Sequence, residues 1–572
     1  MAKRLLSGAD ILLECLIEEG VRYIWGYPGG AILPTYDALP KYRDRIHHIL
    51  VRHEQSAAHM ADGYARATGQ VGVCMATSGP GATNLVTGIA TAMMDSSPVV
   101  CITGQVPRPV IGTDAFQETD VTGITLPITK HNYLVMDIDE LADSIREAFY
   151  VARSGRPGPV LVDIPKDIQN QKIEWEYPTK PIRLPGYRPP KLATQEQIAD
   201  ALKLINEAKK PLILAGHGLI MSGATNEARD LAEIAQIPVA LTLLGKGALP
   251  EGHPLVIGMM GMHGAAASNF AIQDADLLIA LGMRFDDRVT GNLKTYSPNS
   301  KKIHIDIDPS EINKNVRVEV GIAGDLKAVL GQLLPGVQQN THTEWIGQIR
   351  DWMEDSDERD IVHRDTGDAL LGAQVINDIW KYTGGEAITT TDVGQHQMLE
   401  AQYYPHKRPQ TMITSGGLGT MGFGLPAAIG AKFGRPDEEV WAIVGDGGFQ
   451  MTMPELATAV QEGIHVTIAI INNGFLGMVR QWQELFHDKN YSETPMFSPD
   501  FVKIAEAYGI PAMRITHRDQ IEEAVRFSRS FKDKKVPVLL EFVVQKEEMV
   551  YPMVPAGANL HDMVRRPKVG EE

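Results

Sequence analysis

Short apolar runs recur along the chain and are separated by segments with helical periodicity. The runs at 277–282, 440–444 and 466–471 are rich in Val, Ile, Leu and Ala, and their length is typical of strands buried on both faces of a sheet. Regular alternation of such strands with helices predicts α/β domains built on doubly wound parallel sheets. Such sheets bind ligands beyond the carboxyl ends of their strands, so the loops after these runs are the first candidates for a functional site.

Two segments interrupt this alternation. Residues 177–191 are rich in Pro and basic residues and indicate an extended connector, and residues 337–368 are charged and contain Trp, which predicts a surface helix and a linker. A length of 572 residues also suits about three domains. The last segment has little periodicity, and we expect it to be ordered only over a filled site. The predicted units are an N-terminal domain at 1–176, a central domain at 192–336, a C-terminal domain at 368–549 and a tail at 550–572.

Composition excludes some partners. The hydrophobic content of 44% is ordinary for a globular protein, and the net charge of −17 disfavours nucleic acids and anionic membranes, which both need clustered basic side chains. Apolar runs all fall short of the roughly 20 residues that a membrane helix needs. The spacing of the three cysteines does not suit a metal site, so we expect them to be reduced residues of the core: Cys15, Cys74 and Cys101. The first residues run into an amphipathic helix without signal-peptide features, so we expect a cytoplasmic protein.

Candidate chemistry appears where two neighbouring strands end. The run at 440–444 is followed by Gly445-Asp446-Gly447, and the run at 466–471 is followed by Asn472-Asn473, with a predicted helix near 453–460 between them. This strand–helix–strand order places Asp446 and Asn473 at one sheet edge. Their oxygens suit Mg²⁺, which takes further ligands from phosphate groups. A lone Gly-Asp-Gly is most often a plain turn, but the pair of motifs predicts a metal-bridged diphosphate.

Glu54 begins a predicted helix that follows a strand at 48–51. On its own, a glutamate in this position most often stabilises the positive end of the helix dipole. A functional alternative is a carboxylate in a dry site, whose raised pKa lets it share a proton with a bound ring. The paired motifs around Asp446 favour this alternative.

Further polar loops follow predicted strands. The turn at 78–84 opens a helix and suits an anion or a cofactor, although many α/β turns share its composition. The loops at 104–118 and 282–288 are polar and irregular, as site loops often are. Asp306 and Asp308 could accept hydroxyl groups of a ligand or simply begin a turn, and the sequence does not decide between the two.

The paired motifs resemble those of thiamine-diphosphate enzymes, in which GDG is followed by NN at this distance. Over almost its whole length, the chain resembles the acetohydroxyacid synthases, also called acetolactate synthases. Two segments, RFDDRVTGN and GMVRQWQ, are more specific than the others and point to this family. The other segments that carry the resemblance are GYPGGAILPTYDAL, RHEQSAAHMADGYAR, SGPGATN, GTDAFQE, HIDIDPSEI, DVGQHQM, GGLGTMGFGLPAA, GDGGFQM and INNGFLGMVRQWQ.

The resemblance implies residues for three cofactors. For thiamine diphosphate, Glu54 would hydrogen-bond the aminopyrimidine ring, and the carbonyl of Gly419 would lie near its amino group. Mg²⁺ would be held by Asp446, Asn473 and the carbonyl of Phe475. The other implied thiamine-diphosphate residues are Gly394, Gln395, His396, Met421, Gly445, Gly447 and Met478. Those implied for FAD, bound by the central domain without net redox chemistry, are Arg156, His263, Gly282, Arg284, Asp306 and Asp325.

The resemblance also implies substrate contacts. Gln117 and Lys166, with the loop around Phe116, would lie near the reacting substrate. Arg288 would pair with the carboxylate of the acceptor ketoacid, and Trp482 would shape a pocket that favours 2-ketobutyrate over pyruvate.

The implied activity is decarboxylation of pyruvate and transfer of the remaining two-carbon unit to a second 2-ketoacid, pyruvate or 2-ketobutyrate. The products would be 2-acetolactate or 2-aceto-2-hydroxybutyrate, in the first common step of valine, leucine and isoleucine biosynthesis. Members of this family place the equivalents of Glu54 and the metal residues on opposite subunits. We therefore expect at least a homodimer, and a small regulatory subunit is a usual partner.

Two alternatives remain at this point. The chain could be another thiamine-diphosphate enzyme, such as pyruvate oxidase, a decarboxylase or glyoxylate carboligase, or a non-catalytic flavin-binding relative. Glu54 argues against the carboligase, and Arg288 and Trp482 argue against the oxidase and the decarboxylase. The resemblance also implies sensitivity to sulfonylurea herbicides, through residues that line the family's herbicide channel: Ala31, Pro107, Ala115, Asp287 and Trp482.

Overall fold

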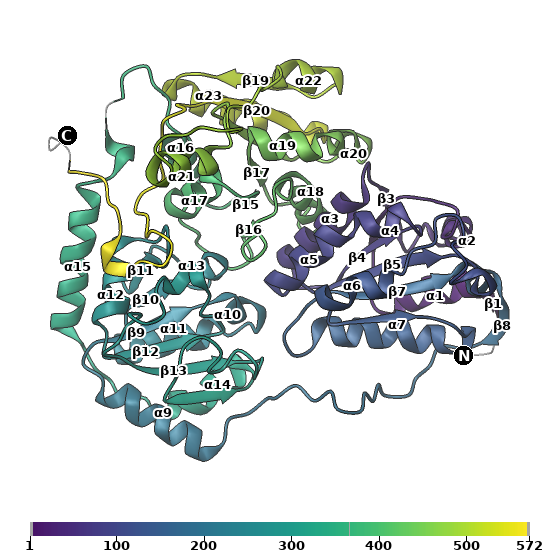
Figure 1. The fold of residues 1–572 in the computed structure, drawn as a ribbon, viewed down its shortest axis with the longest axis horizontal. Helices are drawn as coiled ribbons and strands as arrows, with labels where there is room; N and C mark the ends of the chain where they lie inside the picture. The colour runs from purple at the N-terminus through teal and green to yellow at the C-terminus, as the bar shows by residue number, and fades with distance from the viewer. Residues whose placement is uncertain (1–3, 365, 569–572) are drawn as a thin grey trace.

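The computed structural model describes residues 4–364 and 366–568. This part of the chain contains three sheets of six strands each and one two-stranded ribbon (Figure 1). Within each large sheet all paired strands are parallel, and each sheet takes its strands from one of the three predicted ranges. The predicted fold class, three doubly wound parallel-sheet domains, is confirmed, and the boundaries at single residues stay predictions.

The N-terminal sheet has the order β3-β2-β4-β5-β7-β6. Alternate residues of its strands face opposite sides, since Val73 and Val100 pack with the helices α1 and α7 while Cys74 and Cys101 join the cluster beside α3. The strands are β2 (Tyr23–Gly26), β3 (His47–Leu50), β4 (Gly72–Ala76), β5 (Val99–Gln105), β6 (His131–Leu134) and β7 (Val160–Pro165). The main helices are α1 (Gly8–Glu18), α3 (Glu54–Thr68), α5 (Val86–Asp95) and α7 (Ile138–Arg153).

One ribbon of this domain was not predicted. β1 (Arg4–Ser7) pairs antiparallel with β8 (Lys172–Trp175), which joins the two ends of the domain. Neither segment shows a clear strand period in the sequence. The two strands stabilise each other by pairing, and because they are far apart in the chain, no local pattern predicts the pair.

The central sheet has the order β11-β10-β9-β12-β13-β14. Its strands are β9 (Pro211–Ala215), β10 (Val239–Leu241), β11 (Val256–Met259), β12 (Leu277–Leu281), β13 (Lys301–Asp306) and β14 (Val320–Ala323). The helices that matter for the site are α10 (His217–Met221), α12 (Ala266–Asp274), α13 (Asp287–Thr290) and α14 (Leu326–Leu333). As predicted, the segment after this domain contains a surface helix, α15 (Thr343–Asp357).

The C-terminal sheet has the order β16-β15-β17-β18-β20-β19. Its strands are β15 (Ile388–Thr391), β16 (Met412–Thr414), β17 (Val440–Gly445), β18 (Thr467–Asn472), β19 (Ala512–Ile515) and β20 (Val538–Val543). Its helices include α16 (Gly372–Thr383), α17 (Gln395–Tyr403), α18 (Gly424–Gly434), α19 (Asp446–Thr452), α20 (Leu456–Gln461) and α21 (Gly477–Phe486).

The helix predicted near 453–460 is present as α20 and the turn before it. A further helix, α19, was not predicted; it begins at Asp446, so the Gly-Asp-Gly segment passes directly from strand to helix. The glycines of this helix are required by close packing, because a side chain at Gly448 would overlap the carboxylate of Asp392. Two glycines in this first turn therefore allow a helix where their propensity alone argues against one.

α3 of the N-terminal domain packs against α18 of the C-terminal domain (Figure 1). A side chain at Gly63 would overlap the backbone of Ala427, and one at Gly430 would overlap the carbonyl of Met60. Small residues on both helices thus let the two backbones touch.

We expect Gly63→Ala to lower the free energy of unfolding by about 1–3 kcal/mol, because the added methyl group must push the two helices apart. Gly331→Ala is the matched control, since Gly331 is also helical and a Cβ there meets open space. The control should gain about 0.5–1 kcal/mol from helix propensity. Denaturant titration of both variants measures the difference, and equal effects would contradict the assigned packing.

The described part of the tail, 550–568, lies on the central domain. Val554 N–H donates to the carbonyl of Met262 over 2.8 Å, and Leu560 and Met563 are buried in the central core. The apolar side chains of the tail therefore cover a protein surface, and the expectation that the tail is ordered only over a filled site stays a prediction. Within the described residues, no helix combines the length and the apolar character that a membrane span requires.

Candidate active site

A cavity of about 1170 Å³ lies where the three domains meet. Small-molecule pockets usually measure roughly 300–1,000 Å³, so this one has room for a large ligand or for parts of two. Its lining comes from the end of α5 and the residues after α7, from the carboxyl edge of the central sheet, and from loops of the C-terminal domain.

The six residues implied for FAD all line this cavity: Arg156, His263, Gly282, Arg284, Asp306 and Asp325. Arg156 reaches across from the N-terminal domain and pairs with Asp308 and Glu311, at 3.3 and 2.9 Å. Burial raises the pKa of Asp306 to about 6. Asp308 accepts hydrogen bonds from the N–H and Oγ of Ser310, so it begins a turn. Of the two aspartates, Asp306 lines the cavity and Asp308 does not.

Two of these residues also serve the fold. Asp325 caps α14, where its carboxylate accepts the N–H of Ala328 over 3.0 Å. The Nδ1 atom of His263 lies 3.2 Å from the carbonyl of Pro552 in the tail. Burial lowers the pKa of His263 to about 4, so the ring is neutral and Nδ1 carries the proton that it donates to this carbonyl.

The two residues implied for the acceptor share the same cavity, although they belong to different domains. Arg288 lies in α13 of the central domain, and Trp482 lies in α21 of the C-terminal domain. Nη1 of Arg288 contacts the sulfur of Met262 at 3.4 Å, and its Nε lies 3.9 Å from the carboxylate of Asp287. The Arg288 side chain is 60% exposed, so a ligand carboxylate can reach the guanidinium. Trp482 packs edge-on against Phe486, with 5.4 Å between ring centroids.

The strand–helix–strand unit around Asp446 is formed as predicted. β17 and β18 are parallel neighbours, so the segments that follow them meet at one edge of the sheet. Asp446 is buried; its carboxylate accepts a hydrogen bond from Ser498 Oγ at 2.8 Å and lies beside the backbone N–H groups of Asn473 and Gly474. Burial raises the pKa of this carboxyl group, which favours a cation as its partner.

Asn473 is held next to a residue implied for the diphosphate. Its amide nitrogen donates to Gln395 Oε1 over 3.2 Å, and its amide oxygen accepts the N–H of Phe475 over 3.0 Å. Gln395 in turn donates to the carbonyl of Glu548 over 2.8 Å. The oxygens available here, one carboxylate, one amide and backbone carbonyls, are the set that Mg²⁺ prefers.

His396 provides an independent sign of an anionic ligand. Its ring is buried, and among the described residues its Nε2 atom has no hydrogen-bond partner. A Cβ at Gly445 would lie 2.9 Å from the ring, so glycine at this position leaves room for it. An unsatisfied nitrogen in such a place costs free energy unless a ligand completes it, and a phosphate oxygen would do so.

The remaining residues implied for thiamine diphosphate lie in the cavity lining or beside the first turn of α19. Gly394, Gly419 and Met478 line the cavity. A Cβ at Gly447 would lie 3.3 Å from Cε of Met421, which places these two residues side by side. Gly394 and Gly419 have φ values of 139° and 72°, which favour glycine at both turns.

Glu54, Gln117 and Lys166 form a separate group at the carboxyl edge of the N-terminal sheet. Glu54 begins α3 and accepts a hydrogen bond from Asn84 Nδ2 over 2.9 Å, so it faces the turn at 78–84. The backbone of Gln117 lies against Gly79 of the same turn, and Lys166 follows β7. None of the three lines the cavity.

Sequence reasoning missed several residues that line the cavity, among them Asp95, Ser96 and His217. The sequence did contain a sign of Asp95. It is the last residue of α5, where a negative charge interacts unfavourably with the helix dipole, and such a position suggests a specific role. His217 follows β9 directly after Gly216, at the sheet edge where ligands bind, and this position is the signal that could have identified it.

Comparison with known proteins agrees with this geometry. Models of the thiamine pyrophosphate enzymes match the chain in three parts, the N-terminal TPP binding domain at 6–124, the central domain at 198–333 and the C-terminal TPP binding domain at 392–542.

Whole proteins match as well. The acetolactate synthase large subunit of Corynebacterium glutamicum is 49% identical over 98% of this chain and 90% of the relative. The probable acetolactate synthase large subunit of Methanocaldococcus jannaschii is 49% identical over 98% and 95%. Acetolactate synthase 1, chloroplastic, of Nicotiana tabacum is 46% identical over 98% and 85%. With its three matched domains and these full-length similarities, the chain belongs to the acetolactate synthase family of thiamine-diphosphate-dependent enzymes.

Proposed function

We propose that the chain decarboxylates pyruvate and joins the remaining two-carbon unit to a second pyruvate or to 2-ketobutyrate. The products are 2-acetolactate and 2-aceto-2-hydroxybutyrate, in the first common step of valine, leucine and isoleucine biosynthesis. The observation that carries this proposal is that Arg288 and Trp482 line the same cavity as Gly394, Gly419 and Met478. An acceptor site thus adjoins the cofactor site, which a carbon–carbon ligase needs.

Thiamine diphosphate, when bound, supplies an electron sink for the carbanion that decarboxylation leaves. Asp446, Asn473 and the carbonyl of Phe475 would hold Mg²⁺, and Gln395 and His396 would hold the diphosphate. The support for this assignment is the buried carboxylate of Asp446 beside the loop of Asn473 and the unpartnered Nε2 of His396.

The protein side chains then have two further tasks. Glu54 would hydrogen-bond the aminopyrimidine ring and hold the proton that the ring must share. Arg288 would bind the acceptor carboxylate through its planar guanidinium, while Trp482 and the neighbouring apolar lining exclude water.

FAD is the proposed occupant of the central-domain part of the cavity. Arg156 and Arg284 offer positive charge for its phosphates, and Asp306 offers a hydroxyl acceptor. The size of the cavity, about 1170 Å³, supports a dinucleotide rather than a small substrate alone.

A second copy of the chain would complete the site. Glu54, Gln117 and Lys166 do not line the cavity of their own chain, so we propose a homodimer, or a larger homo-oligomer, in which one protomer supplies this group to its partner's cofactor. The relatives named as large subunits support a small regulatory subunit as a further partner. Three free cysteines, all buried, support a reducing, cytoplasmic location.

The direct test is product analysis from pyruvate with thiamine diphosphate, Mg²⁺ and FAD, each omitted in turn. We expect acetolactate, and no product without thiamine diphosphate or Mg²⁺. Acetaldehyde or acetyl phosphate in its place would show that Arg288 and Trp482 do not form an acceptor site, and the chain would then act as another thiamine-diphosphate enzyme. No turnover by protein that binds the cofactors would favour a non-catalytic relative.

Arg288→Gln should lower kcat/KM for 2-ketobutyrate by about 10–100-fold, because charged hydrogen bonds to the acceptor are lost. Initial rates at fixed pyruvate and varied 2-ketobutyrate measure this. Arg317→Gln is the control, since Arg317 is an exposed arginine of the same domain outside the cavity lining. An equal effect of both changes would remove Arg288 from the acceptor site.

Sulfonylurea sensitivity also stays a prediction. Asp287 and Trp482 line the cavity, while Ala31, Pro107 and Ala115 lie in the N-terminal domain and outside this lining. If a partner subunit brings its own N-terminal domain to the cavity, the five residues form one channel. Inhibition of the assembled enzyme tests this, and absence of inhibition at high micromolar concentrations would contradict it.

A further inference from the structure

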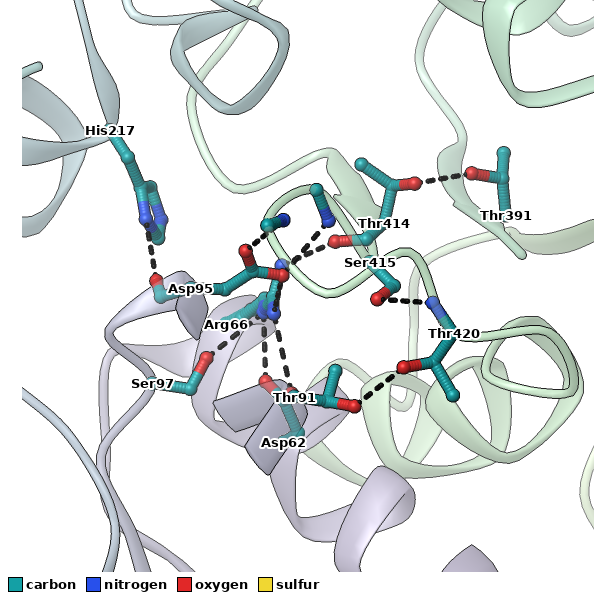
Figure 2. A network of polar contacts seen from close by, with 12 residues as sticks. Asp62, Arg66, Thr91, Asp95, Ser97, His217, Thr391, Thr414, Ser415 and Thr420 are labelled. Atoms are coloured by element: carbon teal, nitrogen blue, oxygen red, sulfur yellow. Dashed lines mark hydrogen bonds and ion pairs between the residues drawn. The ribbon is translucent and has the colours of Figure 1, made fainter. Parts of the chain in front are cut away.

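A buried network of polar side chains joins the three domains next to the cavity (Figure 2). Its centre is Arg66 in α3, whose side chain is 4% exposed and pairs with two carboxylates that are fully buried, Asp62 and Asp95. The guanidinium also donates to Ser97 Oγ at 3.0 Å and to the carbonyl of Thr414 at 2.6 Å. All three nitrogen atoms of Arg66 therefore have partners, and the arginine has little freedom to move.

Asp95, which is held by Arg66, also binds the C-terminal domain. Both of its oxygens accept backbone N–H groups, from Gly416 at 2.9 Å and from Gly417 at 2.6 Å. These glycines begin the turn at 416–419, and all four residues of the turn line the cavity. A Cβ at Gly417 would lie 3.0 Å from Asp95, so the carboxylate and the turn fit closely.

The other end of the turn is held by the same helix, α5. Thr91 Oγ1 lies 2.8 Å from Thr420 Oγ1, and the N–H of Thr420 donates to Ser415 Oγ over 2.9 Å (Figure 2). Side chains of α5 thus hold the turn at 416–419 at both of its ends.

The end of α5 also contacts the central domain. Nδ1 of His217, in that domain, lies 3.2 Å from the carbonyl oxygen of Asp95. Within the N-terminal domain, Nε of Arg156 donates to Ser96 Oγ over 2.9 Å. His217 and Arg156 both line the central part of the cavity. Consecutive residues at 95–97 therefore contact all three domains.

We infer that Asp95, anchored by Arg66, is a positioning residue that sets the geometry of the turn at 416–419 and so orients the Gly419 carbonyl toward thiamine diphosphate. The inference rests on the proposed function, in which this carbonyl meets the amino group of the cofactor. Asp95 makes no contact with the reacting atoms; it acts through the backbone that it holds.

Two isosteric variants of the full-length protein separate this role from plain stability. Asp95→Asn and Asp62→Asn each remove one of the two negative charges that pair with buried Arg66, but only Asp95 contacts the turn at 416–419. Both should lower the melting temperature. Only Asp95→Asn should raise the Kd for thiamine diphosphate, in the presence of Mg²⁺, by about tenfold or more, because the amide places a donor against a backbone N–H.

Kd is measured from quenching of tryptophan fluorescence, and the circular-dichroism band of the bound cofactor reports its orientation. Equal Kd values and equal bands for the two variants would overturn the inference. Failure of the unmodified protein to bind thiamine diphosphate would instead overturn the proposed function.

Thr91→Val keeps the test decisive if Asp95→Asn does not fold. It removes the contact with Thr420 and a bond to the carbonyl of Thr87 within α5, and it should raise the same Kd about threefold to tenfold. Thr383→Val is its control, because Thr383 is a buried helical threonine that pairs with a hydroxyl group, that of Tyr404, at 3.0 Å. An unchanged Kd in Thr91→Val, with the control equal to it, would also count against the inference.

Discussion

Glu54→Gln should lower kcat by about 10²–10⁴-fold while leaving the fold intact, because the amide keeps the size of the side chain but cannot take up the proton that the cofactor ring must share. Glu54 lies at the start of α3, and its carboxylate accepts a hydrogen bond from Asn84 Nδ2 over 2.9 Å, which the amide oxygen of glutamine can also accept. Steady-state rates at saturating pyruvate, together with far-UV circular dichroism, measure both parts of the prediction.

The competing role of Glu54 is stabilisation of a helix dipole. That role is worth about 0.3–1 kcal/mol, and it predicts a small loss of stability with full activity. Glu344→Gln provides the comparison, because Glu344 lies in the first turn of α15, away from the cavity. If the two variants behave alike, Glu54 has only the structural role.

Asp446→Asn should weaken Mg²⁺-dependent binding of thiamine diphosphate by more than about 100-fold. Loss of an outer partner of a metal ligand typically costs about 10–100-fold in affinity, and Asp446 is proposed as a direct ligand with the only full negative charge in its set. Titration calorimetry with thiamine diphosphate at several Mg²⁺ concentrations measures the effect.

Ser498→Ala is the graded control for this variant. Ser498 Oγ donates to the Asp446 carboxylate over 2.8 Å, so its removal changes the orientation of the ligand without removing it. We expect an effect within about 10–100-fold. Unchanged Mg²⁺ dependence in Asp446→Asn would show that the metal, if present, lies elsewhere.

The metal site illustrates what sequence reasoning can reach. Asp446 and Asn473 follow two apolar runs that are strong strand signals, and parallel neighbours must end at the same edge of a sheet. Their proximity therefore followed from local pattern and one topological rule. The helix that begins at Asp446 was missed, because the close approach of Gly448 to Asp392 is a contact between distant segments.

The Arg66 network illustrates what sequence reasoning did not reach. Asp62 and Arg66 are four residues apart in α3, a spacing that usually indicates an exposed ion pair. Here both are buried, and Asp95 and the turn at 416–419 complete the set from two other parts of the chain. No local pattern encodes such a meeting of side chains.

The sequence by itself determined the alternation of strands and helices that predicts parallel sheets, and it placed Asp446 and Asn473 at one sheet edge, because periodicity, turn residues and motif spacing are local properties. The resemblance to a known family supplied most of the other site residues. Only the tertiary structure decided which domains meet at the cavity, that Arg288 and Trp482 share it, that the tail covers the central domain, and that Glu54 stays outside it within one chain. These outcomes depend on the fit between surfaces far apart in sequence, and the free energy of that fit is a property of the packed side chains together.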